Sequence, residues 1–299
     1  MSLTEPRRLE LTVSSEQAGK KVDTLLRRAL GLSGTVIRRV KWLEDGILLD
    51  GMRVHTDVRV TPGQRLSVRL TDPEGGSGVT PFPGSLDIVY EDEDILVVNK
   101  APGVLCHPGH GHFSDTLGNF IVDYYQRSGF PADFHPVHRL DKGTSGLLVT
   151  AKHPHAQEVL KKQLHTPDFR RIYLAVCDGI PAPEAGLIDA PIGRVPDSLM
   201  ARQVDPEGQC ARTRYQVLHT ACGRALLRLE LETGRTHQIR VHMAHLGHPL
   251  TGDFLYGVED HALITRPALH SAELALRHPI TGAPMRWELP LPNDMAALL

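Results

Sequence analysis

Nine residues in the middle of the chain, HRLDKGTSG (138–146), combine acidic and basic side chains with two glycines directly before an apolar run, LLVTA (147–151). Polar segments punctuated by glycine that open onto an apolar strand are typical of functional loops held by a rigid scaffold. Asp141 is the candidate for chemistry in this loop. Burial raises the pKa of a carboxyl group, and an arginine partner keeps it ionised and oriented. Such an aspartate serves as a nucleophile or a base, although a turn or helix cap is the competing interpretation.

Two other segments carry side chains suited to act beside such a carboxylate. FRRIYLAV (169–176) is typical of a strand, and the ring of its Tyr173 offers a face on which a planar base can stack. ETGRTHQIRVH (232–242) places Arg235 directly after a Thr-Gly turn, where we expect a helix to begin. These three side chains from separate segments can converge in one cleft. An ordinary strand aromatic and a structural ion-pair partner are the competing interpretations of the tyrosine and the arginine.

Motifs of several common enzyme classes are missing from the sequence. The tetrapeptide HRLD (138–141) is similar to part of a kinase catalytic loop, but the downstream Asn, the D-F-G segment and the Gly-rich phosphate loop are absent. No G-x-x-x-x-G-K-[ST] loop or Rossmann glycine pattern occurs, which argues against a nucleotide cofactor. No G-x-S-x-G nucleophile elbow occurs either. Kinases, nucleoside triphosphatases and hydrolases of this type are therefore excluded.

The 17 histidines do not form a recognisable metal motif. Four of them lie close together in the sequence: His237, His242, His245 and His248. On a helix the last three drift around the axis by about 60° per step, and no H-E-x-x-H pattern with its single face is present. The loop CHPGHGH (106–112) has ligand-type residues without a ligand spacing. We expect no metal, and expect these histidines to form hydrogen bonds or to contact RNA.

The composition indicates an ordinary globular protein. The chain has 299 residues, of which 41% are hydrophobic and 23% charged, enough for a large domain with or without a small one. The N-terminal residues MSLTEPRRLE lack the apolar core of a signal peptide, and no apolar stretch is long enough to cross a bilayer. The four cysteines form no C-x-x-C pair. We expect free thiols in a cytoplasmic enzyme.

The distribution of charge is more informative than the net charge of −2. Residues 1–72 contain 13 Lys and Arg against 9 Asp and Glu, a balance of +4. Residues 73–98 contain no basic residue and six acidic ones. A basic N-terminal module is thus concealed within a nearly neutral chain, as expected for a part that contacts nucleic acid.

A stretch rich in Gly, Pro and Ser, TDPEGGSGVTPFPGS (71–85), interrupts the chain. Such a composition does not sustain a helix or a strand and is typical of a linker. We therefore predict a small domain over residues 1–72, a linker over 73–85 and a catalytic domain over 86–299.

The small domain has the pattern of a small α+β module. Its expected helices and strands cover 22–29, 34–44, 47–49 and 64–70. The second helix has an outward face with Arg38, Arg39 and Lys41. These side chains form either a solvated helix face or a set of contacts to RNA phosphates, and their clustering in a basic module favours RNA.

In the large domain, strands outnumber helices and often follow one another directly. The expected strands are 86–90, 95–100, 146–152, 170–176, 212–219 and 225–231, and the expected helices are 155–164 and 235–246. Consecutive strands favour an α+β fold with a mixed, mostly antiparallel sheet over a βαβ array.

Five segments, in this order and spacing, resemble the RluA-type pseudouridine synthases. They are VVNKAPGVLCHP (97–108), HRLDKGTSGLLVTAK (138–152), RRIYLAV (170–176), LETGRTHQIRVHMAHLGHPLTGD (231–253) and ALHSAELALRHP (268–279). The resemblance covers about residues 86–292. Residues 19–70 resemble the αL-type RNA-binding domain that precedes the catalytic domain in many synthases acting on large-subunit ribosomal RNA.

The resemblance implies isomerisation of uridine within RNA, without cofactor or metal. The bond from the sugar to N1 of uracil breaks, the base turns, and the sugar is rejoined through C5. Asp141 is then the essential catalytic residue, as a nucleophile or as the base of a path through a glycal-like intermediate. Tyr173 would stack on the extruded uracil, and Arg235 would pair with Asp141.

Other residues are implied to bind the RNA rather than to act on the base. Arg139 would help to hold the target nucleotide out of its stack, because extruding a base leaves a space to be filled. His138 and His107 lie in loops that would contact RNA. Arg240, His242 and Gly252-Asp253 are interpreted mainly as scaffold.

We therefore predict a monomeric RNA pseudouridine synthase that acts through Asp141 on structured RNA, with 23S ribosomal RNA as the expected substrate. Transfer RNA is the alternative substrate. A non-catalytic RNA-binding or ribosome-assembly factor on the same fold is the competing function. An RNA glycosidase, recognised by release of free uracil, and a metallohydrolase, inactivated by chelation, are two further alternatives.

Overall fold

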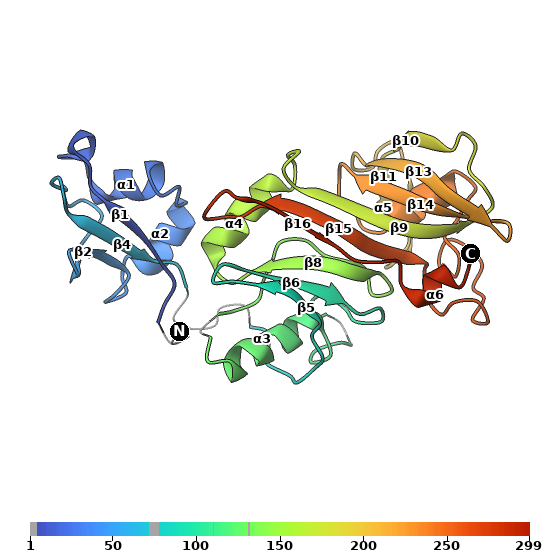
Figure 1. The fold of residues 1–299 in the computed structure, drawn as a ribbon, viewed down its shortest axis with the longest axis horizontal. Coiled ribbons are helices and arrows are strands. Elements are labelled where there is room, and N and C mark those ends of the chain that lie inside the picture. Colours follow the sequence, from blue (N-terminus) through green and yellow to red (C-terminus); the bar gives the residue numbers. More distant parts are fainter. Residues whose placement is uncertain (1–4, 72–77, 110, 131) are drawn as a thin grey trace.

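The computed structural model describes residues 5–71, 78–109, 111–130 and 132–299 (Figure 1). The expected boundary at residue 72 and the first part of the linker expected over 73–85 lie outside the described residues. Residues 78–85 form no helix or strand. One sheet is formed by residues before this segment, and a separate, larger sheet is formed by residues after it.

The N-terminal part is a four-stranded antiparallel sheet covered by two short helices. Its strands are β1 (Arg8–Thr12), β2 (Ile47–Leu49), β3 (Met52–Arg53) and β4 (Arg65–Arg69), in the order β1-β4-β2-β3. Its helices are α1 (Val22–Arg28) and α2 (Gly34–Val40), with a 3-10 turn, η1 (Ser15–Gln17). Val22, Leu25 and Leu26 of α1 and Val36, Ile37 and Val40 of α2 are buried in one core with β4. The second helix ends earlier than expected, because the Leu43 amide bonds to the Val40 carbonyl in a tighter turn.

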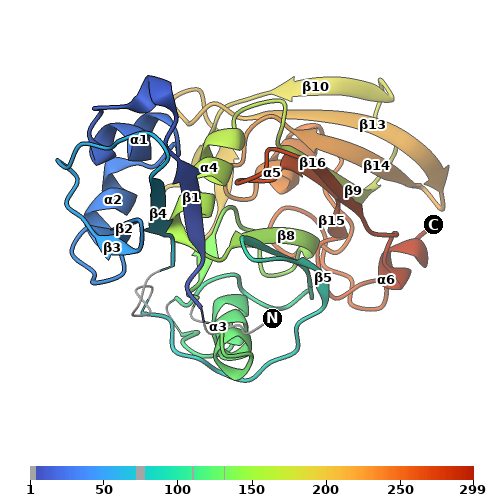
Figure 2. The same ribbon diagram turned by 60° about the vertical axis from the view of Figure 1, so that its left-hand side comes forward.

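The large domain is built on a ten-stranded sheet (Figures 1 and 2). Eight strands follow the order β10-β13-β14-β9-β15-β8-β6-β5, with β16 pairing β15 and β7 pairing β8. Their bounds are β5 (Ile88–Glu91), β6 (Ile95–Lys100), β7 (His135–Pro136), β8 (Ser145–Ala151), β9 (Arg170–Asp178), β10 (Ala185–Asp189), β13 (Arg212–Ala221), β14 (Arg224–Leu231), β15 (Leu269–Arg277) and β16 (Pro284–Glu288). Among the residues that the structure describes, only β15 and β8 pair in parallel within this sheet. The predicted α+β fold with a mostly antiparallel sheet is confirmed.

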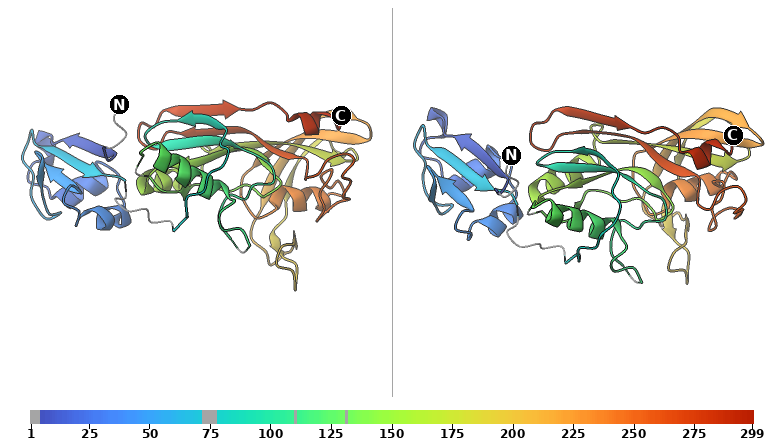
Figure 3. Two further views of the ribbon diagram at one scale, coloured as in Figure 1. Left: turned by 90° about the horizontal axis from the view of Figure 1, so that it is seen from below. Right: turned by 60° about the horizontal axis from the view of Figure 1, so that its bottom comes forward.

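Alternation of buried side chains gives this sheet two packed faces. In β6, Leu96 and Val98 point into one core while Ile95 and Val97 point into another, as the two-residue period of a strand requires. The first core is covered by α3 (Leu117–Arg127) and α5 (Gln238–His245), which lie on the same side of the sheet (Figure 3). Tyr173 is buried in this core as well.

The remaining elements pack around the other face and the end of the sheet. They are α4 (Pro154–Gln163), α6 (Asn293–Ala296) and the hairpin of β11 (Ile192–Arg194) and β12 (Arg202–Val204). The expected helices at 155–164 and 235–246 correspond to α4 and α5, whereas α3 was not expected. Among the described residues, the structure contains no helix that is both long and hydrophobic enough to cross a bilayer.

The structure shows why glycine is needed at position 146, next to the loop that carries Asp141. Its φ is +108°, and a Cβ atom there would lie 2.3 Å from the carbonyl oxygen of Ser271 in β15. Any side chain would therefore push β15 away from β8, and these two strands form the parallel pair. This close approach fixes the start of β8 at Ser145, so that Asp141 lies in the loop four residues before the strand.

An ion pair joins the N-terminal segment to the large domain. Arg7 Nε lies 2.9 Å from Asp94 Oδ1 and Arg7 Nη2 lies 3.1 Å from Oδ2, while His153 Nε2 lies 2.9 Å from Oδ1. Burial alone would raise the pKa of Asp94, but hydrogen bonds from His153 and Arg7 hold it well below its ordinary value. Asp92, Asp94 and His278 lie close enough together for a cation, but Arg7 already supplies a positive charge there.

Four partly or fully buried histidines make the folded state sensitive to acid. Burial lowers the pKa of His135, His155 and His270 from 6.5 to about 4, and that of His138 to about 3. The unfolded chain therefore binds more protons than the folded chain as the pH falls from 6.5 towards 4. Stability is present above this window and is lost as the pH is lowered through it.

We expect these four groups to set a slope of about 5 kcal/mol per pH unit in the free energy of unfolding near pH 5. Urea unfolding at several pH values between about 7 and 5 measures the slope. His155→Gln cannot titrate, so it should reduce the slope by about 1.4 kcal/mol per pH unit. An unchanged slope in this variant would show that His155 is charged in the folded state.

Candidate active site

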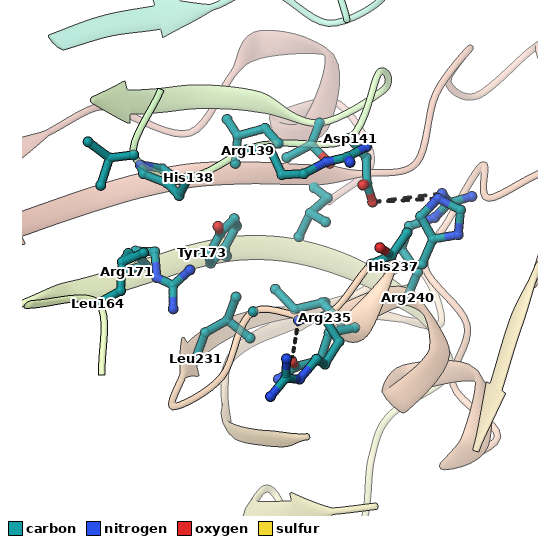
Figure 4. A pocket seen from close by; sticks show the side chains of 18 of the residues that line it. His138, Arg139, Asp141, Leu164, Arg171, Tyr173, Leu231, Arg235, His237 and Arg240 are labelled. Carbon is teal, nitrogen blue, oxygen red and sulfur yellow. Dashed lines mark hydrogen bonds and ion pairs between the residues drawn. The ribbon is translucent and has the colours of Figure 1, made fainter. Parts of the chain in front are cut away.

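A cavity of about 240 Å³ opens where the loop before β8, the middle of β9 and the turn between β14 and α5 meet (Figure 4). Its lining includes Asp141, Tyr173 and Arg235, so the three predicted catalytic side chains do share one cavity. A second cavity of about 760 Å³ lies on the other side of the Asp141 loop and shares Asp141 and Arg139 with the first. Asp141 therefore stands at the junction of two cavities.

Contacts from the preceding segment fix the loop that carries Asp141. Cys106 Sγ lies 3.2 Å from the Leu140 carbonyl oxygen, and the Leu140 amide donates back to that sulfur at 3.3 Å. Lys100 is buried and its ammonium donates to the carbonyl oxygens of Ala101, Val104 and Lys142 at 2.8, 2.8 and 3.3 Å. Burial lowers the pKa of Lys100 to about 8. Asp141 is thus positioned on both sides by buried neighbours.

Two cationic or polar groups of α5 face the Asp141 carboxylate (Figure 4). Arg240 Nη1 lies 4.0 Å and His237 Nε2 lies 3.9 Å from Asp141 Oδ2. Arg240 is itself clamped by Asp253, with Nε 2.7 Å from Oδ2 and Nη2 2.6 Å from Oδ1. Burial alone would lower the pKa of Arg240, but Asp253 outweighs this effect and raises it. Arg240 therefore presents a permanent positive charge to the carboxylate.

The predicted pairing of Arg235 with Asp141 is wrong. Arg235 Nε donates to the carbonyl oxygen of Cys210 at 3.0 Å, and its amide donates to Gln238 Oε1 at 2.9 Å. The helix begins at Gln238 rather than at Arg235, since Gln238 caps the preceding turn and His237 has a left-handed φ of 58°. Arg235 consequently lies in the turn at the rim of the cavity. Arg240, five residues further along the chain, faces Asp141 instead.

His237 is held by a contact that the sequence did not suggest. Its Nδ1 lies 2.8 Å from the Tyr256 hydroxyl, and the two rings meet edge to face. Burial lowers the pKa of His237, although the charge of Asp141 opposes the shift. Tyr256 also lies against Arg240, with the guanidinium carbon 5.0 Å from its ring centroid. A single aromatic side chain thus positions both groups that face Asp141.

Tyr173 occupies the base of the cavity. It lies in β9 with only 4% of its surface exposed, and burial raises the pKa of its hydroxyl. Leu231, Ile239 and Leu269 line the cavity beside it. An aromatic ring among apolar side chains favours a flat, uncharged ring as the ligand of this cavity.

The predicted RNA-binding residues of the loop differ in accessibility. Arg139 is exposed and lines both cavities, which suits a group that enters the space left by an extruded base. His138 lines the smaller cavity, but its Nε2 accepts a hydrogen bond from the Val149 amide at 3.4 Å. Burial keeps this imidazole neutral near pH 7. His107 packs edge to face on Phe134 and lines neither cavity.

The basic residues of α2 lie at the surface of the small domain. Arg38 and Arg39 are exposed, while Lys41 is half-buried with its ammonium 4.9 Å from the ring centroid of Trp42. Trp42 is itself 65% exposed. A helix with this combination of cations and an exposed aromatic ring can bind a polyanion, and no contact with the two cavities is made.

Sequence reasoning assigned Arg240 and Asp253 to the scaffold and did not single out Tyr256. No spacing signal singled out Arg240, because His237 lies outside the helix with a left-handed φ of 58°. Asp253 follows a turn and lies 13 positions away, so its pairing depended on the fold. His242 is a scaffold residue, because its two ring nitrogens are bonded to Thr213 Oγ1 and the Ala190 carbonyl at 2.8 and 2.9 Å.

Taken together, the cavity offers one half-buried carboxylate, a fixed guanidinium beside it and an aromatic ring below. A carboxylate in this position can attack an electrophilic carbon or accept a proton. His237 Nε2 lies 3.9 Å from Asp141 Oδ2, which is too far for a hydrogen bond. Asp141 therefore does not orient a histidine that activates a hydroxyl or thiol nucleophile. The arrangement suits chemistry on a planar base attached to a sugar.

Comparisons with known proteins support this chemistry. Residues 94–245 match the family of RNA pseudouridylate synthases. The chain is 42% identical to the "Uncharacterized RNA pseudouridine synthase YjbO" of Bacillus subtilis, over 90% of this chain and 95% of that protein. It is 38% identical to "Ribosomal large subunit pseudouridine synthase D" of Escherichia coli strain K12, over 97% and 93%, and 37% identical to the protein of that name from Nitrosomonas europaea, over 97% and 87%.

A solved structure gives the same result. "Human RNA Pseudouridylate Synthase Domain Containing 4" superposes with a TM-score of 0.58 at 26% identity, covering 71% of this chain and 91% of that one. The family model and the relatives of 37 to 42% identity agree with the fold and with the chemistry of the cavity. The chain therefore belongs to the RluA-type RNA pseudouridylate synthases, which are isomerases.

Proposed function

We propose that this pseudouridine synthase isomerises specific uridines in large-subunit ribosomal RNA, as a monomer in the cytoplasm, with Asp141 as the catalytic residue. The observation that carries the proposal is the placement of the Asp141 carboxylate, opposite Arg240 and in the same cavity as Tyr173. The names of the relatives from Escherichia coli and Nitrosomonas europaea support ribosomal RNA as the substrate.

We assign a step to each side chain of the cavity. Uridine becomes pseudouridine when the C1′–N1 bond breaks, C5 bonds to C1′, the C5 proton leaves and N1 gains a proton. Asp141 either attacks C1′ or removes the C2′ proton, and in both roles its carboxylate faces the Arg240 guanidinium at 4.0 Å. Tyr173 supports one face of the uracil while it turns. Arg139 enters the space that the extruded base leaves in the RNA.

Basic side chains from both domains act on His135, which lines neither cavity. Burial is the main cause of the low pKa of His135 in β7, and the charges of Arg39 in α2 and Lys161 in α4 lower it further. The helices α2 and α4 lie on facing sides of the junction between the two sheets (Figure 2). An RNA strand that leaves the cavity past Arg139 would therefore meet the basic face of α2. This supports a role of the small domain in binding phosphates.

We expect Arg38→Gln, Arg39→Gln and Lys41→Gln, combined, to weaken RNA binding mainly at low salt. Each lost phosphate contact reduces the slope of log K against log salt concentration by about 0.7, so the slope should fall by about 2. Fluorescence anisotropy with a ribosomal RNA fragment at several salt concentrations measures it.

A matched control removes three arginines of the same domain that lie outside the α2 face. Arg27, Arg53 and Arg65 pair with Asp23, Glu44 and Glu10, respectively. Their combined change to Gln should alter the slope much less. Equal changes in both triple variants would contradict a specific role of the α2 face.

Purified protein with unmodified transcripts tests the proposed function. Single-turnover reactions with large-subunit ribosomal RNA fragments and with transfer RNAs, followed by pseudouridine detection, should give product at few positions in ribosomal RNA. Product in transfer RNA alone would show that transfer RNA, rather than ribosomal RNA, is the substrate. Binding without any product in either RNA would favour the non-catalytic factor, and free uracil would favour a glycosidase.

A further inference from the structure

Arg171 is a buried cation that lacks a protein counterion. Only 7% of the residue is exposed, and its Nε is buried without a hydrogen-bond partner. Across residues 5–71, 78–109, 111–130 and 132–299, no acidic side chain forms an ion pair with it. A guanidinium does not lose its proton in proteins, so burial cannot neutralise it as it neutralises histidine or lysine. The charge of Arg171 is therefore available to a ligand.

Other buried arginines of the large domain show what a structural role looks like. Arg240 is clamped by Asp253 with contacts of 2.7 and 2.6 Å. Arg266 is held by Asp294 with contacts of 2.7 and 3.0 Å. Each of these guanidinium groups has its compensating carboxylate in the protein. Arg171 differs from both, because its surroundings are a backbone turn, an aromatic ring and a neutral histidine.

The fold aims Arg171 into the cavity that holds Asp141. Arg171 and Tyr173 are two positions apart in β9 and so lie on the same side of the strand, where both line the cavity (Figure 4). Gly234, in the turn before α5, leaves the room for it. A Cβ atom at Gly234 would lie only 2.9 Å from Arg171 Nη1. The Phe169 ring, 5.9 Å from the guanidinium carbon, covers another side.

The charge of Arg171 acts on its neighbours in this cavity. The hydroxyl of Tyr173 has a pKa raised by burial, and the positive charge of Arg171 opposes that rise. The pKa of His138 is lowered by burial first and by Arg171 second. Arg171 thus supplies a positive charge at the Tyr173 end of the cavity, while the Asp141 carboxylate supplies a negative one.

We propose that Arg171 is a catalytic residue that stabilises the uracil anion formed when the base separates from the sugar. The proposal rests on the proposed function and deepens it. In the displacement path an Asp141 oxygen bonds to C1′ as the C1′–N1 bond breaks. In the elimination path Asp141 removes the C2′ proton, and a C1′–C2′ double bond forms as the C1′–N1 bond breaks. In both paths the electron pair of the broken bond leaves with N1.

The detached base thus carries one negative charge, shared by N1 and the two carbonyl oxygens. When C5 of the turned base donates an electron pair to C1′, the charge is consumed. In the displacement path Asp141 leaves C1′ as a carboxylate, and in the elimination path it returns the proton to C2′. The C5 proton is then lost to a base and N1 takes up a proton. Arg171 faces the base throughout, and its interaction with the base is strongest in the interval when the base carries the negative charge.

A fixed cation in a water-excluded cavity lowers the energy of a charged transition state more than that of a neutral ground state. Neutral uracil would gain little from Arg171, whereas the departing anion gains a full charge interaction. The uncompensated burial of the guanidinium is the cost of this arrangement, since a buried unpaired charge destabilises the folded chain. Removing the charge should therefore slow the reaction without destabilising the protein.

The test compares Arg171→Met with the wild type and with Arg171→Lys on two RNA substrates. One ribosomal RNA fragment carries uridine at the target, and the other carries 5-fluorouridine. Fluorine withdraws electrons and stabilises the base anion without help from the protein. Nuclease digestion and mass spectrometry follow the loss of the original N1-linked nucleoside in single-turnover reactions, and Kd is measured for both RNAs.

We expect Arg171→Met to slow the loss of uridine by about 10²- to 10³-fold, with little change in Kd. On 5-fluorouridine the loss of rate should be at least fivefold smaller, and Arg171→Lys should retain part of the rate on both substrates. The midpoint of thermal unfolding should stay equal or rise in Arg171→Met. A merely structural residue would slow both substrates by the same factor and would lower the midpoint.

Equal rate factors on the two RNAs, or full activity of Arg171→Met on uridine, would overturn the proposal. These results are distinct from failure of the proposed function. In that case the wild-type protein itself would form no pseudouridine in the ribosomal RNA fragment. A substrate found in transfer RNA would simply move the same comparison to that RNA.

Discussion

Asp141→Asn should lower the single-turnover rate of pseudouridine formation by at least about 10³-fold. Asparagine has nearly the same shape, so the loop between Leu140 and Gly146 keeps its contacts to Cys106 and β15. The amide, however, is neither a nucleophile nor a base of useful strength. Both candidate paths through Asp141 are lost together.

The affinity of Asp141→Asn for RNA should not fall with the rate. The Asp141 carboxylate lies 4.0 Å from Arg240 and 3.9 Å from His237, so its removal frees positive charge at the mouth of the cavity. Asp141→Asn is therefore expected to bind the phosphate backbone as tightly as the wild type or more tightly. Single-turnover kinetics and equilibrium binding on the same RNA fragment separate the two effects.

Asp189→Asn provides a matched control for this result. It makes the same chemical change at an exposed carboxylate, which pairs with Arg212 at 2.8 Å and lines neither cavity. Its rate should remain within about twofold of the wild type, since exposed ion pairs contribute little. If Asp141→Asn and the control gave the same rate, Asp141 would not be the catalytic group.

Arg240→Met should damage both stability and catalysis. Asp253 is fully buried, and Arg240 supplies its two short ion-pair contacts. Removing one partner of such a pair leaves a buried charge without compensation and costs about 3 to 5 kcal/mol. Asp141 loses at the same time the guanidinium that faces it at 4.0 Å, so the rate should fall beyond any loss of folded protein. Urea unfolding measures the first effect and single-turnover kinetics the second.

The double variant Arg240→Met with Asp253→Asn separates these two consequences. It removes both charges, so most of the lost free energy of unfolding should return. Activity should not return, because Asp141 still lacks its cation. A double variant with recovered activity would show that Arg240 acts only through the stability of the fold. A single variant as stable as the wild type would contradict the buried ion pair itself.

Much of the catalytic domain could be predicted from strand periodicity. The alternation of apolar side chains in β6, β8 and β9 locates these strands and the side of β9 on which Tyr173 lies. The segment with Asp141 precedes a fully buried strand, so its place at a sheet end follows from the same pattern. Local signals therefore sufficed to bring the aspartate and the tyrosine together.

The arginine partner of Asp141 could not be found in this way. A helix start at Arg235 and one at Gln238 differ by three residues, which is nearly one turn. The choice depends on the Gln238 side chain, which accepts from Thr233 and Arg235 and thereby ends the turn. Likewise the buried partner of Arg240, Asp253, is set by a loop that returns across the sheet end. Such contacts depend on tertiary structure rather than on spacing.

Helix α3 was missed for a different reason. Its sequence, LGNFIVDYYQR, contains β-branched and aromatic residues that are also common in strands. The Thr116 and Asn119 side chains close a capping box at its start, and Tyr125 is completely buried against the sheet. Packing on the sheet, rather than intrinsic propensity, therefore decides in favour of the helix here.

The most direct test of the central claim is a map of pseudouridine at single-nucleotide resolution in ribosomal and transfer RNA. Cells that lack this gene would be complemented with the wild type or with Asp141→Asn. We expect at least one pseudouridine in large-subunit ribosomal RNA to be absent from the deletion strain and to return only with the wild type. A site that returns equally with Asp141→Asn, or no change in ribosomal RNA at all, would contradict the central claim.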